Sequence, residues 1–140
     1  RLWEGLISKF DAYGSFEGGP ERSDLERIAE EEFEHFRLLE QAIRQLGADP
    51  TVVTPSADLQ ATLGKGLLDV IVDARTDLVQ SLEAILIAEL ADNDAWYALI
   101  VLTRHAGDED LISRFASASA DEADHLERVR LWLARAEGRV

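Results

Sequence analysis

Apolar side chains recur every three or four positions along most of the chain, and this is the period of an amphipathic α-helix. Strand-like alternation is nearly absent, with only residues 51–54 locally β-like. Four long helices, separated by turns rich in glycine and proline, are predicted over residues 2–13, 23–46, 67–105 and 108–136. The segments follow one another as hairpin, long connector, hairpin, with residues 47–66 as the crossover. The pattern therefore predicts an all-α fold, a single four-helix bundle domain over residues 1–140.

Local signals predict several helix ends. Ser23 followed by Glu26 predicts a capping box at the start of the second helix. Gly47 and Gly107 predict the ends of the second and third helices, because glycine adopts the left-handed conformation that closes many helices. Asp108 is expected to cap the fourth helix.

The crossover contains signals for a short extra helix. Thr54–Pro55 can begin it, because proline is tolerated at the first helical position. Gly64 and Gly66 are expected to break it. The third long helix is then expected to begin between residues 67 and 76 and to end at His105.

Two of the predicted helices place charged side chains in their inward-facing stripes. On the second helix the inward positions are Leu25, Ile28, Glu32, His35, Leu39, Ala42 and Leu46. On the fourth helix they are Leu111, Phe115, Ala118, Glu122, His125, Val129 and Trp132. The two stripes match position for position, with an offset of 90 residues. Each places a carboxylate and an imidazole three residues apart on one helix face, so that the pair can bind a single ion.

A further carboxylate, Glu89, interrupts the stripe of the third helix. Glu89 lies 18 residues before Gly107 and Glu122 lies 15 residues after it, so an antiparallel hairpin brings the two to nearly the same height. Asp92, one turn after Glu89, is either a neighbour of this group or exposed. Trp96 is assigned to packing rather than to a hydrogen-bonding role.

Burying such groups without partners would cost several kcal/mol each. Two divalent cations would balance four carboxylates, with the two histidines as neutral ligands. The adjacent Glu30, Glu31 and Glu34 are assigned to a solvated helix face. A metal site is the simplest physical reason for charged groups in the inward stripes.

The segments Glu32-Phe33-Glu34-His35 and Glu122-Ala123-Asp124-His125 resemble the duplicated Glu-x-x-His motifs of ferritin-like, rubrerythrin-like di-metal carboxylate proteins. The spacing of 33 residues from Glu89 to Glu122 is also similar to theirs. The resemblance covers nearly the whole chain and implies a ferritin-like bundle in which Glu32 and Glu122 bridge two metal ions. It also implies that His35 and His125 each cap one ion and that Glu89 is a terminal ligand.

The family also has a glutamate on the first helix, for which Glu4 is the candidate. Its spacing to Glu32 is 28 residues, against 33 in the second half, and it flanks the stripe formed by Trp3 and Phe10. Either the first loop is short or the ligand precedes Arg1. The sequence holds no Met, so we expect residues ahead of Arg1 in the natural protein.

Composition excludes several classes of protein. The 140 residues include no Cys, which excludes a disulfide framework, a thiolate zinc site, an iron–sulfur cluster and a cysteine nucleophile. Asp and Glu number 28 against 14 Lys and Arg, a net charge of −14, so nucleic acids and membrane surfaces are not expected partners. The longest apolar run, Ala95–Leu102, is eight residues, too short to span a bilayer, and we expect a cytoplasmic protein.

Three classes of function fit these features. The first, which we expect, is a di-iron oxidoreductase that uses dioxygen or peroxide, with manganese or zinc as other candidate metals. The second is non-catalytic iron storage or delivery, and the third is a structural ferritin-like module poor in metal. Electrons for an enzyme would come from an external donor, because the chain has no Cys for a rubredoxin-type centre.

The third predicted helix is apolar almost all round, from Leu82 to Ala88 and again from Ala95 to Leu102. A bundle helix needs an apolar stripe only about 100° wide. Either the crossover segment 55–72 or a second subunit must cover the rest. We expect a homodimer with part of this helix in its interface.

Overall fold

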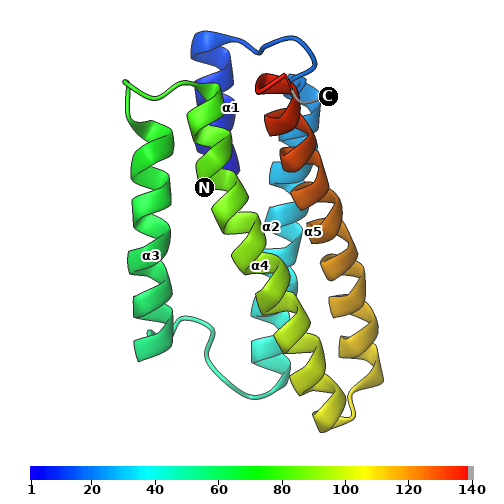
Figure 1. The fold of residues 1–140 in the computed structure, drawn as a ribbon. Coiled ribbons are helices and arrows are strands. Elements are labelled where there is room, and N and C mark those ends of the chain that lie inside the picture. The colour runs from blue at the N-terminus through cyan, green and yellow to red at the C-terminus, as the bar shows by residue number, and fades with distance from the viewer. Residues whose placement is uncertain (139–140) are drawn as a thin grey trace.

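The computed structural model describes residues 1–138 and contains five α-helices and no strand within that range. The helices are α1 (Leu2–Tyr13), α2 (Arg22–Gln45), α3 (Pro55–Val72), α4 (Leu78–Ala106) and α5 (Glu109–Ala136). The all-α prediction is confirmed. Figure 1 shows α1, α2, α4 and α5 side by side, with α3 on the outer side and α1 along only the upper part of the group.

Two apolar clusters fill the interior, and charged side chains lie between them. The larger cluster joins all five helices and includes Val129 of α5. The smaller cluster includes Phe115, also of α5. Between these two positions α5 carries Glu122 and His125, which are 1% and 0% exposed. The inward stripe predicted for this helix is therefore buried along its whole length.

The predicted end of α4 and the predicted start and end of α5 agree with the structure to within one residue. α4 closes at Gly107, whose φ of 75° is the left-handed conformation that favours glycine. The Asp108 side chain then accepts the N–H of Leu111 at 3.0 Å and caps α5. α5 ends at Ala136, as predicted.

α2 also agrees with the prediction to within one residue at each end, but its cap and the position of Leu46 differ from it. The backbone N–H of Glu21 donates to the Asp24 carboxylate at 3.3 Å, so α2 begins at Arg22 and the capping box predicted at Ser23 is wrong. At the other end, Leu46 follows the last helical residue and is 73% exposed. Leu46 therefore does not belong to the inward stripe.

The crossover prediction is correct about where a helix begins and wrong about where it ends. The Ala57 N–H donates to the Thr54 side chain at 3.1 Å, with Pro55 in the first turn. α3 then continues past Gly64 and Gly66 as one helix of 18 residues. A glycine costs only about 1 kcal/mol inside a helix, which is too little to end one that is well capped.

The interruption lies instead between α3 and α4, because α4 begins at Leu78, beyond the predicted range. Asp77 accepts the backbone N–H of Gln80 at 2.8 Å, and the Gln80 side chain accepts the N–H of Asp77 at 3.0 Å. This reciprocal pair is a capping box. Its Asp-x-x-Gln spacing is present in the sequence.

A buried lysine stabilises the connection between α3 and α4. Lys9 of α1 is 6% exposed, and its Nζ donates to the carbonyl oxygens of Asp73 at 2.6 Å and Thr76 at 2.8 Å. The Tyr13 hydroxyl donates to the Ala74 carbonyl at 3.0 Å. The ammonium adds a charged donor to the Asp73 carbonyl, which also accepts from Thr76, and to the Thr76 carbonyl, so α1 anchors this corner.

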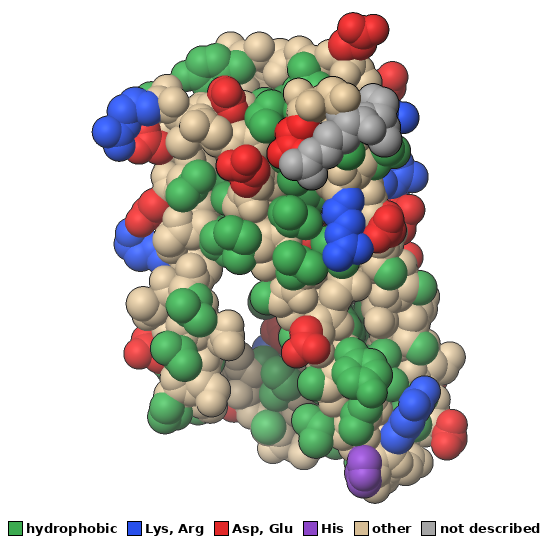
Figure 2. All heavy atoms as spheres, in the orientation of Figure 1, with side chains coloured by type: hydrophobic (Ala, Val, Ile, Leu, Met, Phe, Trp, Pro, Cys, Tyr) green, Lys and Arg blue, Asp and Glu red, His purple; other side chains and the backbone are tan. Residues whose placement is uncertain are grey.

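The first half of α3 stands apart from the other helices. Residues 55–63 are exposed throughout. In the space-filling view an open gap lies between the lower part of α3 and α4 (Figure 2). Only the second half of α3, where Ile71 is fully buried, joins the large apolar cluster.

α4 remains partly uncovered where α3 leaves it. Its exposed large apolar side chains are Ile87, Leu90, Tyr97 and Leu102. Tyr97 is therefore not a core residue. Within residues 1–138, neither α4 nor any other helix combines the length and the apolar character needed to cross a membrane.

Candidate metal centre

Four of the six predicted ligands converge in the charged layer between the two apolar clusters. Each offers one ligand atom, and these atoms all lie within 4.8 Å of one another: Glu32, Glu89, Glu122 and His125. The residues come from α2, α4 and α5. A fifth, His35, adjoins the group, because its Nδ1 lies 2.8 Å from Glu122 Oε1. The two helix stripes and the hairpin register thus bring together the residues that the sequence predicts.

Glu4 lies outside this group. Its side chain is 76% exposed, and its carboxylate is 3.8 Å from the N-terminal ammonium of Arg1. The inward position on α1 belongs to Trp3, which is 4% exposed. Adjacent residues on a helix point about 100° apart, so Glu4 lies on the flank and the prediction that it joins the ligands is not met.

Two glutamates in the group are buried, and only one oxygen of each carboxylate has a hydrogen-bond partner. Glu89 and Glu122 are each 1% exposed. Oε2 of each carboxylate is buried without a hydrogen-bond partner. An unpaired buried carboxylate oxygen is costly, and a cation is a partner that would satisfy both oxygens at once. The donor set of carboxylates and imidazoles therefore fits a divalent metal.

Two tryptophans hold the other oxygen of each buried glutamate. The indole N–H of Trp3 donates to Glu89 Oε1 at 3.0 Å, and that of Trp96 donates to Glu122 Oε1 at 3.0 Å. These bonds leave Oε2 of each carboxylate directed away from the indoles. Helical spacing placed both tryptophans inward, but it carries no signal for where an indole N–H points, so the hydrogen bond of Trp96 was not predicted.

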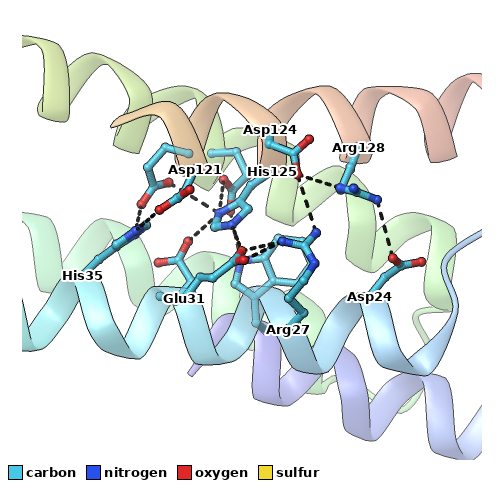
Figure 3. Close-up of polar contacts among 12 residues, drawn as sticks. Asp24, Arg27, Glu31, His35, Asp121, Asp124, His125 and Arg128 are labelled. Atoms are coloured by element: carbon cyan, nitrogen blue, oxygen red, sulfur yellow. Dashed lines mark hydrogen bonds and ion pairs between the residues drawn. The ribbon is translucent and has the colours of Figure 1, made fainter. Parts of the chain in front are cut away.

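His125 is held between two carboxylates of α2. Its Nδ1 lies 3.1 Å from Glu32 Oε1, and its Nε2 lies 2.7 Å from Glu31 Oε2. Glu31 is therefore not on a solvated face, and that assignment was wrong. Figure 3 shows the Glu31 carboxylate directed at the imidazole. Because each nitrogen faces a carboxylate, the imidazole carries a proton on both nitrogens when it donates to Glu31 and Glu32. A metal ion at the centre of the group would replace the proton on Nδ1, while Nε2–H would continue to donate to Glu31.

His35 repeats this arrangement from the other side. Its Nδ1 faces Glu122, and its Nε2 lies 3.3 Å from Asp121 Oδ2 (Figure 3). Glu31 and Asp121 are also 90 residues apart, so the offset that relates the two motifs extends to the acid before each motif glutamate. This repeated acid is the sequence signal that could have identified both.

A chain of charges connects Glu31 to the surface between α2 and α5 (Figure 3). Arg27 donates to both oxygens of Glu31 at 2.7 Å and lies 3.6 Å from Asp124. Arg128 donates to Asp124 at 2.7 Å and lies 3.5 Å from Asp24. Burial alone would raise the pKa of Glu31, but its hydrogen bonds with His125 and Arg27 lower it, which keeps this carboxylate charged.

Two acids of α4, the buried Glu89 and the exposed Asp92, have strongly raised pKa values without metal. Burial raises the pKa of Glu89 to about 8, and repulsion from Glu32 and Glu122 adds to the shift. Asp92 lines the adjoining cavity and is exposed to solvent, and partial desolvation there, together with Glu122 and Glu32, raises its pKa to about 7. In the metal-free protein Glu89 therefore keeps its proton at neutral pH, and a bound cation would favour its charged form.

Both histidines shift in the opposite sense from isolated buried imidazoles. Burial by itself would lower the pKa of His125, yet its hydrogen bonds with Glu32 and Glu31 outweigh this and raise it to about 9. Burial is the largest single effect on the pKa of His35 and lowers it, but Glu122, Asp121 and Glu32 together raise it by more, so this pKa is also raised. In the metal-free protein the extra proton on His125 does part of what a metal cation would do.

No family model matches the chain, and no curated protein and no solved structure matches it. The geometry of this centre therefore carries the functional inference.

Proposed function

We propose that the protein is a ferritin-like di-metal carboxylate protein, an oxidoreductase that uses dioxygen or peroxide. The observation that carries this proposal is the pair of buried Oε2 atoms of Glu89 and Glu122, which have no hydrogen-bond partner and lie 3.9 Å from His125 Nδ1. A third carboxylate and a second imidazole lie beside them. In a core without metal, burial of these oxygens would destabilise the fold, because nothing compensates for their lost hydration. The arrangement of α1, α2, α4 and α5 supports a ferritin-like bundle, in which α3 is the crossover helix.

In this proposal the ligands follow the resemblance of the two motifs. Glu32 and Glu122 bridge two ions, His35 and His125 each bind one ion through Nδ1, and Glu89 is a terminal ligand. The three carboxylates leave one positive charge of two divalent ions unbalanced. Asp92 borders the same cavity and would supply the fourth negative charge.

Iron is the metal we propose, since imidazole and carboxylate ligands suit Fe(II), and Mn(II) or Zn(II) would fit the same donors. A pair of ferrous ions would supply electrons for the reduction of dioxygen or peroxide. The protein residues would hold the ions, orient the carboxylates and exclude water. The external electron donor is a separate molecule, because the chain has no Cys to bind a redox cluster.

The test begins with metal uptake under anaerobic conditions. Two equivalents of Fe(II) should raise the melting temperature by about 10 °C when metal exceeds its dissociation constant by about a hundredfold. Oxygen or peroxide added next should oxidise the bound iron faster than free Fe(II), which is followed by optical absorbance. Iron that binds but oxidises no faster than in buffer would support storage or delivery and overturn the enzyme proposal.

Matched variants distinguish metal binding at this centre from nonspecific binding to the acidic surface. Glu122→Gln keeps an oxygen for the Trp96 N–H but removes the bridging charge, and it should abolish the metal-induced rise in melting temperature. Glu30→Gln, on the exposed face of α2, should behave like the wild type. Equal responses of the two variants to Fe(II) would overturn the metal assignment.

A further inference from the structure

A cavity of about 710 Å³ opens beside the metal centre, between the first turn of α1 and the facing sides of α2 and α4. Its lining residues are Arg1, Leu2, Trp3, Glu4, Ala29, Glu32, Phe33, Phe36, Ala88, Glu89 and Asp92. Two of the clustered carboxylates, Glu32 and Glu89, are thus part of its wall. Ligand sites for small organic molecules fall in this range of volume.

The outer part of the cavity is aromatic. Phe33 and Phe36 are 52% and 61% exposed, although both are large apolar side chains. Their rings lie nearly parallel, with an interplanar angle of 10° and centroids 6.4 Å apart. The Arg37 guanidinium lies over the Phe33 ring, 4.4 Å from its centroid. Phe33 is therefore contacted by a cation, whereas Phe36 remains exposed. Exposed aromatic side chains at the rim of a cavity are typical of a recognition surface.

The inner part of the cavity has room because its side chains are small. Ala29 of α2 and Ala88 of α4 lie where a larger residue would fill the space between the helices. Together with Leu2 and Trp3 they give the cavity apolar lining next to the two phenylalanines and the carboxylates. A path for a hydrated metal ion would instead be expected to carry polar groups along its length.

The charges around the cavity select against anions. Four carboxylates line it, from Glu4, Glu32, Glu89 and Asp92. Arg1 is the one basic residue in the lining, and its terminal ammonium lies near the Glu4 carboxylate. An anionic ligand would meet an acidic lining on a protein with a net charge of −14, whereas a neutral ring would meet apolar side chains and the open face of the aromatic pair.

We infer that this cavity binds a neutral aromatic molecule of one or two rings, stacked against Phe36 and reaching inward to Glu32 and Glu89. One consequence of this inference rests on the proposed function: if the centre is oxidative, its substrate is an organic molecule rather than free iron. Binding itself requires no metal, so the two proposals can fail separately.

The direct test uses 2-naphthol as the probe and 2-naphthoate as its anionic counterpart, at pH 7. Titration calorimetry is carried out on the full chain, metal-free and loaded with Zn(II), which does not change oxidation state. We expect 2-naphthol to bind at one site per chain, and 2-naphthoate to bind at least tenfold more weakly. Absence of saturable 2-naphthol binding in both forms, or equal affinity for both compounds, would overturn the inference.

Variants locate the site. Phe36→Ser removes the exposed ring, and Ala29→Phe fills the inner space, and each should weaken 2-naphthol binding at least tenfold. Leu46→Ser, at an equally exposed apolar side chain after the end of α2, should leave affinity unchanged. Melting curves check that each variant is folded. Unchanged affinity in both cavity variants would place the probe elsewhere and overturn the inference.

The outcomes also separate this inference from the proposed function. Uptake of Zn(II) and Fe(II) without 2-naphthol binding would refute the organic ligand and leave the metal centre intact. Binding of 2-naphthol that depends on Phe36, without any metal uptake, would refute the metal centre and leave the ligand cavity intact.

Discussion

His125 Nε2 and Glu31 Oε2 lie 2.7 Å apart across the contact between α2 and α5. Because this bond occupies Nε2, the ring is oriented with Nδ1 toward Glu32 and the centre of the cluster. A carboxylate that donates no ligand to a metal can still determine how a histidine presents its nitrogen. Glu31 is therefore a positioning residue for the proposed metal centre.

Replacement of this carboxylate should weaken metal binding without removing a ligand. We expect Glu31→Ala to lower the affinity for Fe(II) or Zn(II) by about 10- to 100-fold, the range measured when such supporting groups are lost. Isothermal titration of the metal-free protein measures the change. Glu30→Ala, one position away and exposed, is the control. Equal affinities in the two variants would contradict a positioning role for Glu31.

The stability of the metal-free protein should fall as the pH rises from about 5.5 to 9. Folded Glu89 keeps its proton up to about pH 8, while in the unfolded chain it loses it near pH 4.5, so the unfolded state binds fewer protons between these values. His125 acts in the same direction. Its stabilisation is complete below pH 6.5 and is lost as the pH rises through about 9.

The expected loss for Glu89 is on the order of a few kcal/mol, since one pKa unit corresponds to about 1.4 kcal/mol. Thermal unfolding in the presence of a chelator at pH 5.5, 7 and 8.5 measures it. Glu89→Gln should flatten the profile, because the amide does not titrate. A melting temperature that is constant or rises across this range would contradict the raised pKa values.

Lys9 offers a test of the fold that is independent of metal. Lys9→Met keeps the apolar stem but removes the ammonium that donates to the Thr76 and Asp73 carbonyls, of which Asp73 still accepts from Thr76. We expect the free energy of unfolding to fall by about 2 kcal/mol. Chemical denaturation measures this value. Lys65→Met, at an exposed position of α3, should change it by less than about 0.5 kcal/mol.

The uncovered side of α4 leads to a prediction about assembly. Ile87 and Leu90 lie one helical turn apart on α4 and are 57% and 46% exposed. We expect a homodimer that buries this surface at micromolar concentrations, and Ile87→Glu should convert it to a monomer. Light scattering coupled to size exclusion measures the mass. A monomeric wild type would contradict the prediction, and Val53→Glu in the exposed crossover is the control.

Much of the fold follows from short-range signals in the sequence. Helical periodicity and the caps at Gly107 and Asp108 predict the end of α4 and both ends of α5 to within one residue. The prediction for the crossover is wrong because it ends the extra helix at Gly64 and Gly66. In the structure α3 continues past both glycines, and the Asp77–Gln80 capping box marks the start of α4. Two modest glycine penalties do not exceed the hydrogen bonds of a continuous helix, whereas a reciprocal cap defines a start.

The candidate site was predictable where it depends on the phase of a helix. The inward stripes placed Glu122 and His125 correctly, because a 90-residue offset and a 3.6-residue period leave little freedom. The burial of residues that flank an inward stripe was not predictable in the same way. Glu31 and Glu4 both lie beside an inward residue, but α5 covers the flank that carries Glu31, whereas Glu4 remains exposed. Which flank a neighbouring helix covers depends on packing that no single segment encodes.

The separation of the first half of α3 has a consequence for backbone dynamics. Residues 55–63 are exposed on every side, so their amides are protected only by hydrogen bonds within one helix, and an isolated helix of this length is marginally stable in water. Gly64 and Gly66 lower its stability further. This segment should therefore exchange its amide hydrogens through local opening, long before α5 does, while Lys9 keeps the second half of α3 attached.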